Sequence, residues 1–345
     1  MAANLKSLIQ QGKVVVARLP KKNNIEVGEL DALAAYTVPL IAHDYGALTP
    51  LMWNTVYEML GVPLRNIMVV ASSESLEEVL GILKNDPKYL GGGVGVGLKE
   101  KVIPHLDAVH PEDLNAVNII VKEGGMLIGY NTDAQGLYQS LQDALAEVRK
   151  TVKESTVVLY GAGGVAKEFA RLLARNDVGT LRIVNRTVSK AVRLAHELNT
   201  EYEKDVAIGV GEDLSRGVVL NSYIPVDALV NTTDKGSDGP LEHVAMYAAA
   251  DDHNESHSRA LLRYLRDLRP DVVIVDIVLP KKGDSVSLRL ARAEGIEHLV
   301  DGKPMVVNQA APAYCKIQKA YPQFHGGQKS EREILGIMRG AVQRA

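Results

Sequence analysis

Two short clusters of residues carry the chemistry that this sequence is equipped to do. Asn131-Thr132-Asp133 closes an apolar run inside the stretch 129–136, and a glycine-rich turn, 161–167, follows one expected helix later. An aspartate among small polar residues can orient or exchange a proton, whereas a glycine-rich turn at a helix start can hold a phosphate. Each cluster alone is a weak signal, since glycines occur in most loops. Their order predicts a small-molecule pocket in which Asp133 faces a dinucleotide bound by the following domain.

The glycine-rich turn fits the pattern G-x-G-x-x-G/A. Gly161 would permit the tight turn, Gly163 would let the backbone approach a pyrophosphate, and Ala166 would allow close packing of a helix on a strand. We expect the whole turn to bind the cofactor: Gly161, Ala162, Gly163, Gly164, Val165 and Ala166. An ordinary strand–helix loop is the alternative.

The residues about 20 positions after the turn indicate which dinucleotide would bind. A NAD-type site offers an Asp or Glu there to the ribose 2′-hydroxyl. This chain instead offers Asn185, Arg186, Thr187 and Lys190. The two cations would pair with a 2′-phosphate and Thr187 could donate a hydrogen bond to it, so the sequence predicts NADP. A solvated basic helix start is the alternative.

The elements needed to position these residues alternate in type along the chain. Around the glycine turn, apolar runs predict strands and amphipathic runs predict helices, which is the context that a dinucleotide-binding turn requires. The expected strands are 67–71, 117–121, 156–160, 180–184, 228–230, 272–275 and 298–300; the expected helices are 75–83, 167–174 and 189–198. The sequence therefore predicts an α/β fold with mostly parallel sheets.

Two regions outside this alternation have separate interpretations. The tail 305–345 reads as two helices broken near Pro322. The polar insertion 251–258 contains His253 and His257, which are spaced like a metal pair but lack an obvious third ligand, so we favour a solvated loop and predict no metal.

Composition limits the possible classes of protein. The chain has 345 residues, which favours two domains, and 46% of them are hydrophobic, as in ordinary globular proteins. The net charge is −3 without a basic block, which argues against nucleic acid as the partner. No long apolar run or secretory leader is present, and Cys315 is the single cysteine. These features predict a cytoplasmic protein that is not embedded in a membrane, either a monomer or a homodimer.

Several motifs in this order resemble those of the shikimate dehydrogenase family over residues 35 to about 325. Thr49-Pro50 is similar to the end of the family's substrate loop, and the segment 93–99 to its lysine-bearing segment. The motifs Ala116-Val117-Asn118, Asn131-Thr132-Asp133 and Asn185-Arg186-Thr187 are also family-like, as are Asn231-Thr232-Thr233 and Gln309.

The resemblance implies roles for these residues. It implies that Lys99 and Asp133 form a catalytic pair and that Thr49, Asn118 and Gln309 bind a small-molecule substrate. It also implies that Asn231, Thr232 and Thr233 pass beside the nicotinamide ribose. The expected domains are 1–137, completed by 305–345, for substrate and catalysis, and 138–304 as a Rossmann domain for NADP.

The chain also departs from the family pattern at the end of the site that would hold a carboxylate. Ala47 stands in place of a serine, Gly93 and Gly95 in place of an asparagine and a threonine, and Trp53 in place of a histidine. A tyrosine expected near Asp276 is missing. Two hypotheses follow: an NADP-dependent oxidoreductase acting on shikimate, quinate or a related polyhydroxylated ring acid, or a non-catalytic NADP-binding sensor with the same fold.

Overall fold

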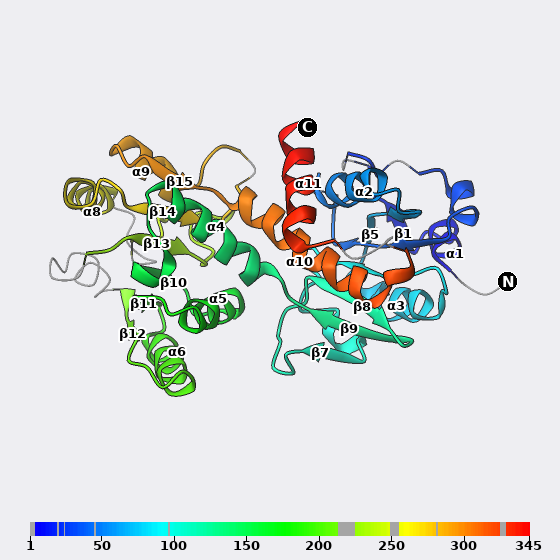
Figure 1. Cartoon of the computed structure of the whole chain (residues 1–345), viewed down its shortest axis with the longest axis horizontal. Helices are drawn as coiled ribbons and strands as arrows, with labels where there is room; N and C mark the ends of the chain where they lie inside the picture. The colour runs from blue at the N-terminus through cyan, green and yellow to red at the C-terminus, as the bar shows by residue number, and fades with distance from the viewer. Residues whose placement is uncertain are drawn as a thin grey trace. The chain divides into compact units, whose positions relative to one another are not determined.

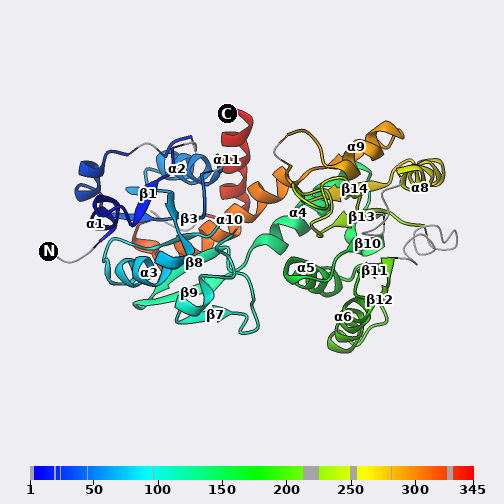
Figure 2. The same cartoon turned by 180° about the vertical axis from the view of Figure 1, so that it is seen from behind.

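The chain folds into two compact units, whose elements are shown in Figures 1 and 2. Unit 1 comprises Met1–Thr132 and Val307–Ala345, and unit 2 comprises Asp133–Val306. The computed structural model describes residues 4–18, 21–23, 25–44, 46–95, 97–212, 225–248, 255–280, 282–324 and 329–345. The boundaries expected from the sequence are 137/138 and 304/305.

Unit 2 is built on a six-stranded sheet in which every pair of neighbours is parallel. Its spatial order is β12 (Ala207–Val210), β11 (Thr180–Val184), β10 (Thr156–Tyr160), β13 (Ala228–Asn231), β14 (Val273–Asp276) and β15 (His298–Val300). Numbered within the unit, this order is 3-2-1-4-5-6, the arrangement of a Rossmann sheet. The order reverses between β10 and β13, where ligands bind such sheets outside the carboxyl ends of the strands. The predicted α/β fold class is confirmed.

Alternate strand residues pack on opposite faces of this sheet. Val157 and Leu159 share a core with α4 (Asp133–Glu147), α5 (Gly164–Arg175) and α6 (Val188–Glu201). Val158 and Tyr160 face the other core, which contains α8 (Glu255–Leu268) and α9 (Val286–Ala293). Because both faces are covered, the strands are mainly apolar rather than alternating, with buried Arg182 of β11 as an exception, and runs such as 156–160 and 180–184 are recognisable in the sequence.

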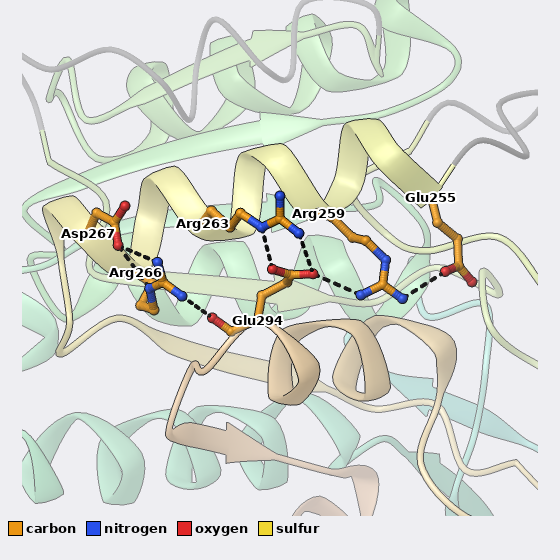
Figure 3. A network of polar contacts seen from close by, with 6 residues as sticks. All are labelled: Glu255, Arg259, Arg263, Arg266, Asp267 and Glu294. Carbon is orange, nitrogen blue, oxygen red and sulfur yellow. Dashed lines mark hydrogen bonds and ion pairs between the residues drawn. The ribbon is translucent and has the colours of Figure 1, made fainter.

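Helices α8 and α9 are also joined by a polar network (Figure 3). Glu294, at the end of α9, accepts hydrogen bonds from Arg263 Nε at 2.6 Å and from Arg259 Nη1 at 2.8 Å. These bonds hold the pKa of the Glu294 carboxyl below its ordinary value. A third arginine of α8, Arg266, donates to the Glu294 carbonyl at 3.0 Å. The network fixes the outer helices of unit 2 to each other at the surface.

One strand of unit 2, β12, was absent from the sequence prediction. It has only four residues, and Gly209 interrupts its apolar pattern. A Cβ added at Gly209 would lie 2.3 Å from the Ala191 carbonyl carbon, so the glycine lets α6 approach the strand closely. The tertiary contact therefore requires a residue that weakens the local strand signal.

The described strands of unit 1 form three small sheets of mixed direction. The first contains β1 (Val14–Val16), β5 (Val69–Ala71) and β3 (Leu40–Ile41); the second contains β2 (Ala35–Thr37) and β4 (Leu64–Asn66); the third contains β6 (Gly91–Gly93), β8 (Ile119–Glu123), β9 (Met126–Tyr130) and β7 (Ala108–His110). Three strand pairs are parallel and three are antiparallel.

The prediction of a mostly parallel sheet is therefore wrong for unit 1. The β8–β9 hairpin shows the reason, because its two strands are joined by Gly124 and Gly125, both with positive φ. A two-residue turn of this kind returns the chain antiparallel, with no crossover helix.

The remaining helices of unit 1 include three, α2 (Thr49–Met59), α10 (Gly302–Ala320) and α11 (Glu331–Gln343), that pack the C-terminal segment of the unit on its N-terminal part. The other helices are α1 (Leu5–Gln10) and α3 (Leu76–Asn85). The short 3-10 helices of the unit are η1 (Val27–Asp31), η2 (Ser73–Ser75), η3 (Ile103–His105) and η6 (Pro322–Phe324), and unit 2 contains η4 (Val152–Glu154). Tyr314 and Met338, from α10 and α11, share a core with Trp53 of α2. The red and blue ribbons of α11 and α2 accordingly lie side by side in Figure 1. The prediction that the last helices return to the first domain is confirmed.

Two glycine substitutions test how closely unit 1 is packed. A Cβ at Gly92 would lie 2.1 Å from the Val38 carbonyl oxygen, whereas one at exposed Gly81, inside α3, would meet no atom within 4 Å. We expect Gly92→Ala to lower the free energy of unfolding by about 1–3 kcal/mol through overpacking. Gly81→Ala should raise it by about 0.5–1 kcal/mol, because alanine has the higher helix propensity. Chemical denaturation measures both, and equal effects would contradict the packing described.

Candidate active site

A buried polar cluster in unit 1 joins three of the segments singled out in the sequence. Asn118 Nδ2 donates to Thr132 Oγ1 at 3.0 Å and to Gln309 Oε1 at 3.1 Å, and Asn118 Oδ1 accepts from the Thr132 backbone N–H at 2.9 Å. Thr132 Oγ1 also donates to the Gln309 carbonyl at 2.9 Å. Asn118 is 6% exposed and Thr132 is 0% exposed, whereas Gln309 is half-buried. The cluster is thus a rigid set of hydrogen-bonding groups with its glutamine partly open.

The hairpin and α10 set the geometry of this cluster. Asn118 precedes β8 and its N–H donates to the carbonyl of Tyr130, the last residue of β9, at 3.0 Å. That contact leaves Thr132 opposite Asn118 just beyond the hairpin. Thr132 is not among the site residues expected from the sequence, although it lies inside the Asn131-Thr132-Asp133 motif. The motif itself was therefore the sequence signal for this threonine.

A backbone hydrogen bond joins Lys99 to the residue before Asn118. The Lys99 carbonyl accepts from the N–H of Val117, the neighbour of Asn118, at 2.8 Å, and the lysine side chain is half-buried. In unit 2, Asp133 is the first residue of α4 and is 6% exposed. A carboxylate in the first turn of a helix is favoured by the helix dipole.

The substrate-loop residues lie at the start of α2. Thr49 is the first residue of this helix and is half-buried, and Leu48, at the N-cap position before it, has no polar side-chain atom that could cap the helix. Trp53, one turn further along, is 1% exposed and packs edge-on against Tyr314 with ring centroids 5.3 Å apart. Trp53 is therefore a core residue.

Gly93 and Gly95, which stand where the family has polar residues, lie in β6 and just after it. The surroundings of Gly93 show whether packing requires a glycine there. A Cβ added to it would be 3.7 Å from the Asn118 carbonyl oxygen and 3.8 Å from Pro39 Cβ, which are ordinary contacts. The packing of unit 1 does not require a glycine there. Val96, in the same segment, lies outside the described residues.

In unit 2, the glycine turn leaves β10 at the point where the strand order reverses. Gly161 has φ +116°, and a Cβ on it would lie 2.5 Å from Thr232 Oγ1 of the loop after β13. Gly163 is the N-cap of α5, and a Cβ there would meet no atom within 4 Å. Ala166 is 1% exposed in the core under the helix. The fold therefore requires Gly161 and Ala166 to be small, whereas the open space at Gly163 suits the approach of a ligand.

The predicted 2′-phosphate residues lie at the end of β11 and the start of α6. Arg186, Thr187 and Lys190 are exposed, and neither cation forms an ion pair with another described residue. Thr187 is the N-cap of α6 but its hydroxyl makes no capping hydrogen bond. Asn185 Nδ2 donates to the Thr187 carbonyl at 3.0 Å and shapes the turn. A cation in the first turn opposes the helix dipole, and a bound anion would relieve this.

The loop after β13 is held by its own side chains. Asn231 is 0% exposed; its Oδ1 accepts from Thr233 Oγ1 at 2.7 Å and its Nδ2 donates to Asp276 Oδ1 at 2.8 Å. Thr232 Oγ1 donates to the Tyr160 carbonyl at 2.7 Å. Burial raises the pKa of the Asp276 carboxyl. These side chains fix the loop, so a ligand here would meet mainly its backbone.

The single cysteine and the polar insertion show neither a reactive thiolate nor a metal site within the described residues. Burial raises the pKa of the Cys315 thiol to about 11, which disfavours the reactive thiolate. Within the ranges that the structure describes, no three His, Cys, Asp or Glu residues are grouped to hold a metal ion, and no helix has the length and apolarity to cross a membrane. Residues 251–254 of the polar insertion, with His253, lie outside the described residues, and from Glu255 the chain is helical rather than a loop.

Comparison with known proteins gives relatives along most of the chain. Residues 143–209 match the family model described as shikimate / quinate 5-dehydrogenase. A shikimate dehydrogenase (NADP+) from Methanosarcina barkeri is 32% identical over 280 residues, which cover 79% of this chain and 88% of the relative.

Solved structures of low sequence identity share the fold. A shikimate 5-dehydrogenase from Thermus thermophilus in complex with NADP(H) and shikimate has a TM-score of 0.60 at 24% identity, covering 89% of this chain and 99% of that one. A quinate dehydrogenase from Corynebacterium glutamicum in complex with NAD also has a TM-score of 0.60, at 22% identity with the same coverage.

Substitutions in the glycine turn separate what the fold needs from what a ligand needs. Gly161→Ala should lower the free energy of unfolding by about 1–3 kcal/mol, because of its positive φ and the clash with Thr232. Gly163→Ala should change it by less than about 1 kcal/mol, since only the N-cap preference is lost, yet should weaken dinucleotide binding. Thermal or chemical unfolding with cofactor titration tests this pair. Unchanged binding by folded Gly163→Ala protein would show that no phosphate approaches there.

Proposed function

The chain belongs to the shikimate dehydrogenase family, and we propose that it is an NADP-dependent oxidoreductase acting on a polyhydroxylated ring acid. It would interconvert a ring ketone and an alcohol on shikimate, quinate or a related compound. The observation that carries the proposal is the hydrogen-bonded cluster of Asn118, Thr132 and Gln309. Both catalytic candidates are joined to it through the backbone: Lys99 by a hydrogen bond to Val117, the neighbour of Asn118, and Asp133 as the residue after Thr132.

The cluster suits a substrate that carries several hydroxyl groups. A hydroxyl both donates and accepts, and a primary amide offers both kinds of partner in a fixed plane. Asn118 and Gln309 would hold such hydroxyls, and the bonds to Thr132 would keep the amides from rotating. Thr49 would supply another hydroxyl from the start of α2.

The other end of the substrate site supports an altered specificity within the family. Ala47, Gly93 and Gly95 offer no polar side chains at positions where family members have them. Because there is room for a side chain at position 93, packing does not require the glycine found there. Each missing hydrogen-bond partner would cost about 1–3 kcal/mol for a substrate group left without one. We therefore propose that the substrate differs from shikimate or quinate at the carboxylate end.

The residues of unit 2 fit NADP. Gly161 and Gly163 provide the turn and the open approach to the start of α5, whose free N–H groups would hold the pyrophosphate. Arg186, Thr187 and Lys190 would hold the 2′-phosphate. The turn of Asn231, Thr232 and Thr233, which contacts Gly161, would pass beside the nicotinamide ribose.

The chemical step that we propose uses Lys99 and Asp133 as one unit. The bound nicotinamide would donate the hydride in reduction and accept it in oxidation. In reduction, the Lys99 ammonium gives a proton to the oxygen that becomes the alcohol; in oxidation, the amine takes it back. Asp133 would orient the ammonium, and Asn118 and Gln309 would hold the neighbouring hydroxyls so that the reacting carbon stays in place.

The cofactor preference is tested at Arg186. We expect Arg186→Ala to weaken NADP binding by about 1.5–3 kcal/mol, the range for a hydrogen bond to a charged group, with little effect on NAD. Arg193→Ala, inside the helix α6 that follows Arg186, removes an exposed arginine that faces Glu197; it is the control and should change neither. Fluorescence titration of both cofactors measures this, and an equal loss for NADP and NAD would refute the assignment.

The catalytic pair is tested with Lys99 and its exposed neighbour Lys101. Lys99→Ala should lower turnover by about 10²–10⁴ while NADP still binds, and adding Asp133→Asn should cost little more. Lys101→Ala should keep the parent rate. Rates are followed at the nicotinamide absorbance with shikimate, quinate and related hydroxy acids. Near-parent turnover by Lys99→Ala would exclude the pair, and tight NADP binding without any substrate would favour the sensor hypothesis.

A further inference from the structure

A buried ion pair lies at the carboxyl edge of the unit 2 sheet and has no place in the function proposed above. Lys235 Nζ lies 2.7 Å from Glu212 Oε1 and donates to the Ala248 carbonyl at 2.5 Å. The Lys235 residue is 3% exposed and the Glu212 side chain is 12% exposed. Removing charges from water is costly, so a pair buried in this way calls for an explanation.

The strand register shows where Glu212 lies. Val184, the last residue of β11, is paired with Val210, the last residue of β12. Arg186 and Glu212 each follow two residues later, beyond the ends of these adjacent strands, where the Asn185 N–H still donates to the Val210 carbonyl at 3.2 Å. This register places Glu212 in the segment next to the one that carries Arg186, the arginine proposed to hold the 2′-phosphate.

Lys235 reaches this carboxylate from a distant strand. It follows β13, and β11 and β10 lie between β13 and β12 in the sheet. The ion pair thus spans the carboxyl ends of the two strands that carry the glycine turn and Arg186. Charge effects agree with this placement. Burial and the nearby Glu212 charge raise the pKa of Tyr160, the residue before Gly161. Burial lowers the pKa of Lys235; the hydrogen bond and charge of Glu212 oppose this, and the positive charge of Arg186 adds a smaller lowering.

We propose that Lys235 is a specificity-determining residue, which neutralises Glu212 and so keeps the neighbourhood of Arg186 positive enough to accept the 2′-phosphate of NADP. This inference rests on the proposed NADP site. Without Lys235, the Glu212 carboxylate would repel the 2′-phosphate and would suit the 2′-hydroxyl of NAD, as acidic ribose ligands do. Lys235 does not touch the cofactor in this role; it acts through Glu212.

A purely structural role makes a different prediction. The Lys235 N–H donates to Thr233 Oγ1 at 3.2 Å and its carbonyl accepts from Asn231 Nδ2 at 3.3 Å, so Lys235 also belongs to the loop after β13. If the ion pair only held this loop, its loss would weaken both cofactors by the same factor. The ratio of the two dissociation constants separates the two roles.

The experiment measures Kd for NADP and NAD by fluorescence or calorimetric titration of the full chain. Lys235→Met should raise the ratio Kd(NADP)/Kd(NAD) by about fivefold or more, because the variant removes one positive charge near a doubly charged phosphate. Glu212→Gln, which keeps Lys235, should lower the ratio or leave it unchanged. The double variant carries neither charge, and its ratio should return to within about twofold of the parent, inside the uncertainty of additive free energies.

A half-buried lysine at the amino ends of the strands of the same sheet provides the control. Lys150 Nζ lies 2.7 Å from Asp227 Oδ1 and 2.5 Å from Asp271 Oδ2, and the Asp227 side chain is 7% exposed. Lys150→Met should destabilise unit 2 but leave the ratio of dissociation constants unchanged. Should Lys235→Met fail to fold, Glu212→Gln and the double variant still test the charge effect.

The outcomes separate this inference from the proposed function. Parallel changes in both dissociation constants for Lys235→Met, or a ratio that the double variant does not restore, would overturn the inference and leave the oxidoreductase proposal in place. A parent protein that binds neither dinucleotide would overturn both. A salt-sensitive change of ratio confined to the Lys235→Met variant would support the inference.

Discussion

One buried asparagine connects the segments on which the candidate active site of unit 1 depends. The Asn118 side chain bonds at once to Thr132 and to Gln309, residues that lie 14 and 191 positions away along the chain. The long-range contact holds α10 against the end of the β8–β9 hairpin. Because a buried amide without partners costs about 1–3 kcal/mol, the three segments have to assemble together. The cluster is therefore both a structural tie and a set of fixed hydrogen-bonding groups.

Unit 2 uses backbone geometry and charge more than side-chain hydrogen bonds. The parallel sheet brings the ends of β10 and β13 together, and Gly161 is the residue that lets Thr232 approach. Two cations then stand exposed after the adjacent strand, while the ion pair of Lys235 and Glu212 lies at the carboxyl ends of the same sheet. A dinucleotide with an additional phosphate suits this distribution of charge.

The two units differ in how far they keep the family pattern. The motifs that would hold NADP are retained in unit 2, and the Asn118 cluster is retained in unit 1. The departures gather at Ala47, Gly93 and Gly95, and Trp53 has become part of the aromatic core with Tyr314. This asymmetry is the pattern expected when one chemistry is kept and the substrate changes at one end.

The sequence by itself determined the elements whose signal is local. Strands 156–160, 180–184 and 298–300 were predicted to the residue, because each is a short and mainly apolar run between polar segments. The glycine turn and the basic residues after β11 were also readable, since a phosphate site needs particular residue types at fixed spacing. Only the tertiary structure decided the mixed sheets of unit 1, the strand β12, the role of Thr132 and the pairing of Lys235 with Glu212. Each of these depends on which segments meet in space, and residues far apart in sequence leave no periodicity by which such meetings could be foreseen.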